Sequence, residues 1–232
     1  MLELSPIELE TLSLSLRVGL WSVITSLPLG LAVAFLLARR NFPGKILVDG
    51  LVHLPLVLPP VVVGFALLVL FGRRGPVGAW LYGTLGVTFA FNWKGAALAS
   101  GVMGFPLMVR AMRLSLELVD RRLEQAARTL GAGRVRVFLT VTLPLMAPGI
   151  LSGVILAFAR SISEFGATIT FVSNIPGETS TLPLALYTLT QVPGHDADAW
   201  RLALLSVALA MAALTLSELL ARRLGRRIQG LA

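Results

Sequence analysis

Long apolar stretches constrain the fold of this chain more than any other feature of its sequence. The first runs from Thr11 to Ala38, and its 28 residues would extend about 42 Å as an α-helix. The hydrocarbon core of a bilayer is about 30 Å thick, so such a helix crosses it with some tilt. Across 232 residues, 56% are hydrophobic and 14% are charged, which is too apolar for a water-facing surface. The sequence therefore predicts an all-α integral membrane protein.

Further apolar stretches have the length that a crossing helix needs. The four additional predicted spans are Ile46–Phe71, about Asn92–Leu118, Val137 to about Phe171, and Arg201–Ala221. Pro28 predicts a kink in the first span. Between spans, Gly72–Phe91 has the composition of a turn-rich connection. Thr181–Thr190 is apolar but too short to cross, which predicts a re-entrant or surface helix. We expect five transmembrane helices and this short helix, with residues 1–232 forming a single domain.

The distribution of basic residues predicts the topology. The connections at 39–45 and 110–136 and the C-terminal RRLGRR hold three, seven and four of the 20 Lys and Arg residues, against five on the other side. Because cytoplasmic loops are enriched in Lys and Arg, five crossings with an external N-terminus and a cytoplasmic C-terminus are expected. The first ten residues contain three Glu and no basic residue, so they lack the basic region of a signal peptide.

The connection between the third and fourth spans, about residues 119–136, contains a polar segment with an ordered pattern. Gln125–Leu130 holds good helix formers, and Gly131 then supplies a helix stop. A second helix is expected to start near Val135 and to run past Pro144 into the fourth span. A compact cytoplasmic helix at the membrane surface is a natural docking element for a soluble partner. The alternative is an ordinary amphipathic loop helix without a partner.

Several function classes lack the residues that they need. The chain has no Cys and two His, so a thiolate metal site is excluded and no metal is expected. It has no G-x-x-x-x-G-K-[ST] loop, and we expect it to bind neither ATP nor another cofactor itself. No nucleophile and base pattern indicates an enzyme. The net charge of +8 comes from basic residues that are expected to orient the spans in the membrane, so no nucleic-acid partner is expected.

Polar residues inside the fourth span indicate a translocation path. Ionisable groups at such depth face the bundle interior or a water-filled cavity. The candidate path residues are Arg160, Ser161, Ser163, Glu164 and Thr168, together with Pro59 and Pro60 of the second span. Hydroxyl groups and a cation suit an oxyanion, but Arg160 and Glu164 are also spaced to pair and lock helix packing. The prolines form either a gate or a fixed kink, and Gly149 and Gly153 permit close helix approach.

The polar connection carries a recognisable pattern. Gln125, Ala126 and Ala127, then Gly131 after three residues and VTLP after nine more, resemble the E-A-A-x3-G-x9-I-x-L-P loop of importer-type ABC permeases. Gln125 replaces the usual Glu and Val141 replaces Ile. The resemblance implies an ATPase-coupling role for seven residues: Glu124, Gln125, Ala126, Ala127, Arg128, Gly131 and Pro144. Glu124 points about 100° away from Gln125 around a helix, so its substitution for the missing carboxylate stays open.

Other segments narrow the resemblance. LVHLPLVLPPVVVGFALL at 51–68, FPLMVRAMR at 105–113 and SEFGATITFVSNIPGETSTLPLALYTL at 163–189 are similar to permease subunits of molybdate ABC importers. The resemblance implies a second copy of the chain, two ABC ATPase subunits that hold ATP and Mg²⁺, and a periplasmic or lipid-anchored oxyanion-binding protein, in a bacterial or archaeal cytoplasmic membrane. Tungstate or sulfate remain alternative substrates. An ion-coupled secondary transporter is a more distant alternative, because no internal repeat is found.

Overall fold

The computed structural model describes residues 5–229. Within them, every element of regular secondary structure is a helix, and turns and loops connect the helices. Side chains at 217, 218 and 220–229 lie outside the described part, and RRLGRR falls among them. The helices are α1 Pro6–Arg39, α2 Lys45–Val57, α3 Pro60–Phe71, α4 Pro76–Leu85, α5 Trp93–Leu118, α6 Arg121–Thr129, α7 Arg134–Val137, η1 Phe138–Thr142, α8 Leu143–Ile162, α9 Gly166–Val172, α10 Leu182–Thr190 and α11 Asp196–Gln229. The all-α prediction is confirmed.

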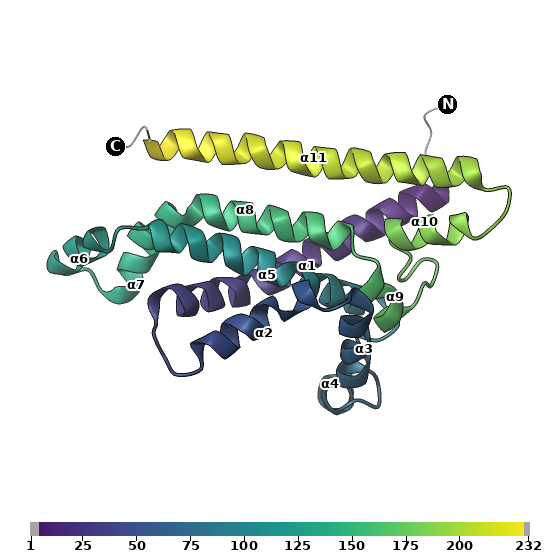
Figure 1. The fold of residues 1–232 in the computed structure, drawn as a ribbon, viewed down its shortest axis with the longest axis horizontal. Coiled ribbons are helices and arrows are strands. Elements are labelled where there is room, and N and C mark those ends of the chain that lie inside the picture. The colour runs from purple at the N-terminus through teal and green to yellow at the C-terminus, as the bar shows by residue number, and fades with distance from the viewer. Residues whose placement is uncertain (1–4, 230–232) are drawn as a thin grey trace.

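Four long helices, α1, α5, α8 and α11, lie side by side along the long axis of the molecule (Figure 1). Within the described residues, each is long and apolar enough to cross a membrane, and the bent pair of α2 and α3 makes a fifth span if it is counted as one. α1 begins at one end of this bundle and α11 ends at the other (Figure 1). A chain whose two ends lie at opposite ends of the bundle crosses it an odd number of times. The count of five, with α2 and α3 taken as one span, therefore agrees with the five predicted spans.

The centre of the bundle is α5, which packs between α1 and α8. Small residues allow the close approach of α5 and α8. A Cβ atom at Gly153 would lie 2.9 Å from the backbone oxygen of Met108, and one at Gly104 would lie 3.0 Å from the backbone oxygen of Ala157. Gly149 faces Ser115 of α5 at still shorter range. The expected close approach at Gly149 and Gly153 therefore occurs within a single chain.

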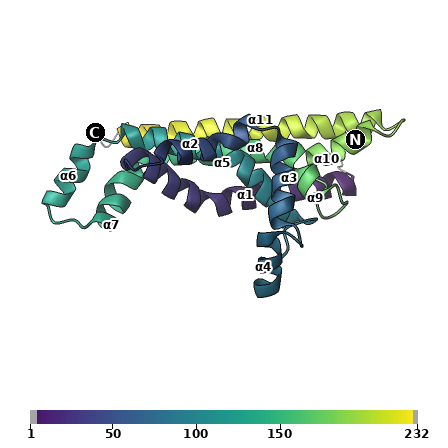
Figure 2. The same ribbon diagram turned by 60° about the horizontal axis from the view of Figure 1, so that its bottom comes forward.

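The second span is sharply broken. α2 and α3 meet at an angle of 115°, with Leu58 and Pro59 in extended conformation between them. Two consecutive prolines remove two backbone donors, so the helix ends there and cannot continue as a gentle kink. As a result α3 projects away from the long helices and carries α4 at its far end (Figures 1 and 2).

Two sequence predictions are wrong in this region of the fold. Residues 72–91 are not only a turn-rich connection, because ten of them form α4. Pro76 begins this helix, and Gly86 ends it with a φ of +64°.

The fourth span does not run unbroken to Phe171: α8 ends at Ile162, and α9 starts at Gly166 after a break. α9 packs against α3, where a Cβ at Gly64 would lie 2.5 Å from a backbone oxygen of α9.

The opposite end of the bundle is organised by α1, α10 and α11. α1 starts five residues before the predicted span, because Ser5 and Glu8 form a reciprocal capping box. The carboxylate of Glu8 also lies 3.0 Å from the guanidinium of Arg201, which ties α1 to α11. The short helix expected at 181–190 is present as α10, and it packs against α11.

Candidate functional site: the connection between α5 and α8

The connection between α5 and α8 lies at one end of the bundle, where α6 and α7 extend beyond the long helices (Figures 1 and 2). α6 begins at Arg121, four residues earlier than predicted, because the side chain of Asp120 accepts a hydrogen bond from the Arg122 amide at 2.9 Å. The helix ends at Thr129, and Gly131 follows with a φ of +85°. The predicted short helix and its glycine stop are therefore confirmed.

After this turn, the chain runs without interruption into the membrane. A single helix of 29 residues extends from Arg134 to Ile162, as the sequence predicted from near Val135 onward. Five residues, Phe138–Thr142, form a wider π-helical turn within it. Pro144 follows directly after this turn inside the continuous helix, where it cannot donate a backbone hydrogen bond to the preceding turn. From Arg134 onward, the connection and the fourth span are thus one continuous helix.

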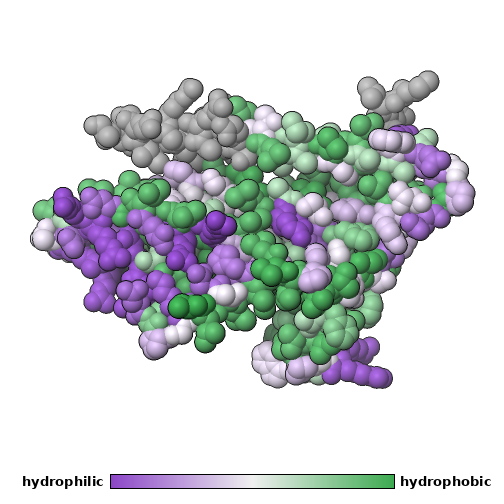
Figure 3. Space-filling model, viewed as in Figure 1, coloured by the Kyte–Doolittle hydropathy of each residue, from purple (hydrophilic) through white to green (hydrophobic). Residues whose placement is uncertain are grey.

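α6 presents two opposite faces. Residues 121, 124, 125 and 128 share one side at helical spacing, and this polar side lines a hollow beside α1 and α7. The other side, about 180° away, carries Leu123, Ala126, Ala127 and Leu130. Leu123 is 50% exposed and Leu130 is 88% exposed. This exposed apolar stripe lies at the end of the molecule where hydrophilic residues gather (Figure 3).

The carboxylate of Glu124 is used within the chain. Its Oε1 atom accepts hydrogen bonds from Arg39 Nη2 at 3.0 Å and from the Thr142 hydroxyl at 2.8 Å. Arg39 also donates to the backbone oxygen of Val119 at 3.4 Å. The side chains of Arg39 and Glu124 are only 10% and 14% exposed. Glu124 therefore ties α6 to the last turn of α1 and to η1.

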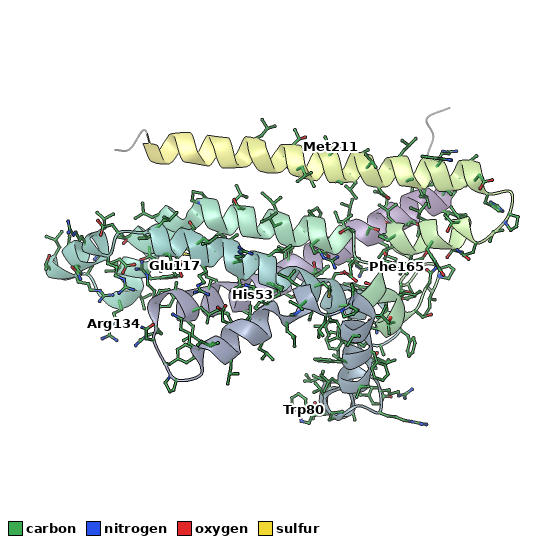
Figure 4. The ribbon with its side chains drawn as sticks, viewed as in Figure 1. His53, Trp80, Glu117, Arg134, Phe165 and Met211 are labelled. Carbon is green, nitrogen blue, oxygen red and sulfur yellow. The ribbon has the colours of Figure 1, made fainter. Side chains whose placement is uncertain are left out.

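The hollow behind α6 has a volume of about 530 Å³. Its walls come from the end of α1, from α6 and from the α7–η1 segment. Among the residues that the structure describes, five arginines line it, namely Arg39, Arg40, Arg121, Arg128 and Arg134, and Glu124 is the one acidic lining residue. Figure 4 shows Arg134 at this end of the molecule. Gln125 and Arg128 therefore lie on the hollow side of α6, whereas Ala126 and Ala127 lie on or near its outward side.

The predicted pair in the fourth span is present. Arg160 Nη1 lies 2.6 Å from Glu164 Oε2, although Glu164 lies in the break that follows α8 and not on the same helix. Its other carboxylate oxygen accepts a hydrogen bond from the Ala167 amide at 2.8 Å and so caps α9. The side chain of Glu164 is 1% exposed and that of Arg160 is 25% exposed. Glu164 fixes the break, and Arg160 reaches the surface beside it.

The other candidate path residues divide between interior and surface. Ser161 is buried and accepts a hydrogen bond from Ser22 of α1 at 2.8 Å. Thr168 is buried, and its hydroxyl has no partner among the described residues. Ser163 and Pro59 are exposed, whereas Pro60 is half-buried. The structure brings Arg160, Ser161 and Glu164 together at the end of α8, and Pro60 lies next to this break, because a Cβ atom at Gly166 would lie 2.9 Å from the Cβ of Pro60.

Sequence reasoning missed a second charged cluster between α2 and α5. Arg113 binds both carboxylate oxygens of Asp49, at 3.0 and 3.1 Å, and contacts Glu117 at 2.9 Å. His53 lies 3.2 Å from Asp49, and Figure 4 marks His53 and Glu117. Asp49 within an apolar span was the available signal, because charges at that depth need partners. The cluster ties the first half of the broken span to the central helix.

Solved structures share this fold. A bacterial ABC transporter involved in the import of the acidic polysaccharide alginate matches with a TM-score of 0.74 and 18% sequence identity, covering 95% of this chain and 80% of that one. The MetNI methionine ABC transporter matches with a TM-score of 0.68 and 15% identity, covering 94% of both chains. The chain therefore has the multi-pass fold of an ABC importer permease.

Sequence comparison places the chain within this class. Residues 26–230 match the model of the binding-protein-dependent transport system inner membrane component, and the chain belongs to that family of inner membrane transport components. The molybdenum transport system permease protein ModB of Escherichia coli (strain K12) is 63% identical over 215 residues, covering 93% of this chain and 94% of that protein. The protein of the same name from Haemophilus influenzae is 56% identical, covering 95% and 96%. The chain is a transport component and not an enzyme.

Proposed function

We propose that this chain is the membrane-spanning permease subunit of an ATP-driven importer that carries molybdate into the cytoplasm. The observation that carries this proposal is its 63% identity to the molybdenum permease of E. coli over nearly the full length of both proteins. The two-sided coupling helix α6 supplies the structural support, because it offers an exposed apolar stripe at the end of the bundle.

The coupling mechanism follows from how α6 is attached. A partner that grips Leu123, Ala126, Ala127 and Leu130 moves α6 as a unit. The Glu124–Arg39 pair transmits this movement to α1, and the continuous helix from Arg134 transmits it to α8. α1 and α8 are the two helices that flank α5. Movement of the loop therefore changes the packing around the central helix, which is the change that alternating access requires.

The proposed assembly contains parts that this chain does not supply. Two copies of the chain pair around a central path, and two ABC ATPase subunits, which hold ATP and Mg²⁺, dock on the α6 stripes. A periplasmic or lipid-anchored binding protein delivers the oxyanion from outside. The alginate transporter that shares this fold was solved with a bound periplasmic protein. The proposed orientation has the N-terminus outside and the α6 end in the cytoplasm, where basic residues are concentrated.

The proposed path includes Arg160, Ser163 and Pro59, which are at least partly accessible. Ser161, Glu164 and Thr168 are proposed to support this lining from behind, because their side chains are buried within the single chain. Pro60 is proposed to hold the break between α2 and α3. Arg160 is paired with Glu164 but is still partly accessible. Such an arginine is suited to transport, because it attracts an oxyanion without holding it tightly.

Sulfate is the second candidate substrate. The sulfate transport system permease protein CysT of E. coli (strain K12) is 37% identical over 203 residues, covering 87% of this chain and 72% of that protein. Sulfate, tungstate and molybdate are tetrahedral dianions, so the same path chemistry accepts all three. The higher identity to the molybdenum permeases favours molybdate.

Uptake into proteoliposomes tests the proposal. The chain is reconstituted with its ATPase and binding protein, and molybdate, tungstate and sulfate accumulation are measured by mass spectrometry with and without internal ATP. We expect ATP-dependent accumulation with molybdate preferred over sulfate. A preference for sulfate would replace the first candidate with the second. Uptake driven by an ion gradient without ATP would place the chain among secondary transporters.

A further inference from the structure

The basic hollow behind α6 has more positive charge than the chain itself neutralises. Within the described residues, the side chains of Arg40, Arg121, Arg128 and Arg134 make no ion pair or hydrogen bond. Arg39 is paired with Glu124, yet its Nε donor is buried without a partner and its side chain is 10% exposed. Five guanidinium groups therefore surround this hollow with one carboxylate among the described residues, which leaves a net positive charge that an anionic ligand would neutralise.

The floor of the hollow is apolar. Phe35 of α1 and Phe138 of η1 meet edge to face, with ring centroids 5.8 Å apart, and both line the hollow. Leu36 and Leu139, the next residue in each case, are 39% and 53% exposed. Charged walls therefore stand directly above apolar helix surface, at the level where the long apolar helices give way to the arginine-rich connection. A ligand that fits both parts carries an anionic group attached to hydrocarbon.

We propose that this hollow binds the phosphate headgroup of an anionic phospholipid, with its acyl chains lying against the exposed surface of α1 and η1. Arginine guanidinium groups bind phosphate oxygens in bidentate fashion, and basic pockets beside transmembrane helices are suited to such headgroups. The bound lipid neutralises the free arginines and holds α6 against α1. The site goes beyond the proposed transport function, because it requires only that this end of the bundle meets a membrane surface.

The position of the hollow argues against an acidic side chain of a docked protein as its occupant. The hollow lies on the polar side of α6, whereas the stripe at Leu123 and Leu130 faces the opposite direction. A protein that grips this outward stripe leaves the hollow on the membrane side of α6. The lipid and a docked protein can therefore be bound at the same time.

Lipid retention by the full-length chain tests the proposal. The chain is purified in mild detergent, and dioleoylphosphatidylglycerol or dioleoylphosphatidylcholine is added before native mass spectrometry. The test variant is Arg40→Gln with Arg134→Gln, which removes two lining charges. The matched control is Arg122→Gln with Arg136→Gln, which removes two exposed charges from the same connection but outside the lining. Both pairs are solvent-exposed, so neither substitution disturbs the packed core.

We expect wild type and control to retain phosphatidylglycerol in preference to phosphatidylcholine. The test variant should bind it roughly fivefold more weakly for each arginine removed, or about 25-fold in total. Equal loss in both variants, or no preference for the anionic lipid, would overturn the site. Displacement of the lipid by millimolar inorganic phosphate would assign the hollow to a free anion instead. Release of the lipid when the ATPase is added would assign it to a protein side chain and overturn the lipid proposal.

Discussion

Removing the charge of Glu124 should loosen the coupling helix while leaving the membrane spans in place. In the Glu124→Gln variant, Arg39 loses its counter-charge although its side chain is only 10% exposed. The Thr142 hydroxyl loses a charged acceptor at 2.8 Å. Hydrogen bonds to charged groups contribute about 1.5–3 kcal/mol each, and the amide oxygen of Gln can keep part of one. We therefore expect α6 to be destabilised by about 2 kcal/mol relative to wild type.

Hydrogen–deuterium exchange of the purified chain measures this effect. A local change of about 2 kcal/mol corresponds to roughly 30-fold faster exchange of the α6 amides, with α8 unchanged beyond its first turns. Glu117→Gln is the matched control, because Glu117 also pairs with an arginine but is 42% exposed and should shift exchange by less than about fivefold. Adding Arg39→Gln to Glu124→Gln should recover part of the loss, since the uncompensated charge is then gone. Equal α6 exchange in wild type and Glu124→Gln would refute the assignment of Glu124 as an internal tie.

Three further substitutions test other parts of the structure. Gly64→Val should lower the thermal stability of the chain by at least 2 kcal/mol, since its Cβ would meet a backbone oxygen at 2.5 Å, whereas Gly83→Ala, with open space around it, should change little. Leu130→Glu should abolish co-purification of the ATPase without affecting membrane insertion, and Arg122→Gln should preserve it; retained binding in both would exclude the outward stripe. Glu164→Ala should destabilise the chain by about 3 kcal/mol in thermal unfolding, because it removes the cap of α9 and leaves a cation uncompensated; an unchanged midpoint would contradict this role.

The spans and the coupling helix could be predicted because each depends on local sequence. Apolar length gives a crossing helix, and Gly131 marks a helix end wherever the chain goes next. Local sequence signals were also present for α4, which was predicted as part of a turn-rich connection. Pro76 and Gly86 bracket α4 as a proline start and a glycine stop, but the arginines before this segment and its glycines favoured a connection.

Other features depend on distant residues and could not be predicted. Pro59 and Pro60 indicate a break, but neither its 115° angle nor the packing of α3 against the distant α9 is encoded in the local sequence. Glu164 was correctly expected to pair with Arg160, yet its second role as the cap of α9 requires the helix break that the apolar pattern conceals. The tie between Glu124 and Arg39 joins residues 85 positions apart, and no periodicity within either segment indicates it.

The π-helical turn at Phe138–Thr142 affects how a movement of the connection between α5 and α8 is passed along the helix into the membrane. The rod from Arg134 to Ile162 has no hinge loop, so rotation at its outer end would turn the whole rod if the hydrogen bonding were uniform. A π-helical turn departs from the i→i−4 hydrogen-bond pattern of its α-helical neighbours, so this turn is the irregular point of the rod. A rotation applied to the outer end of this helix can thus be taken up over one turn before it reaches the membrane-spanning part, so the helix acts as a torsion spring.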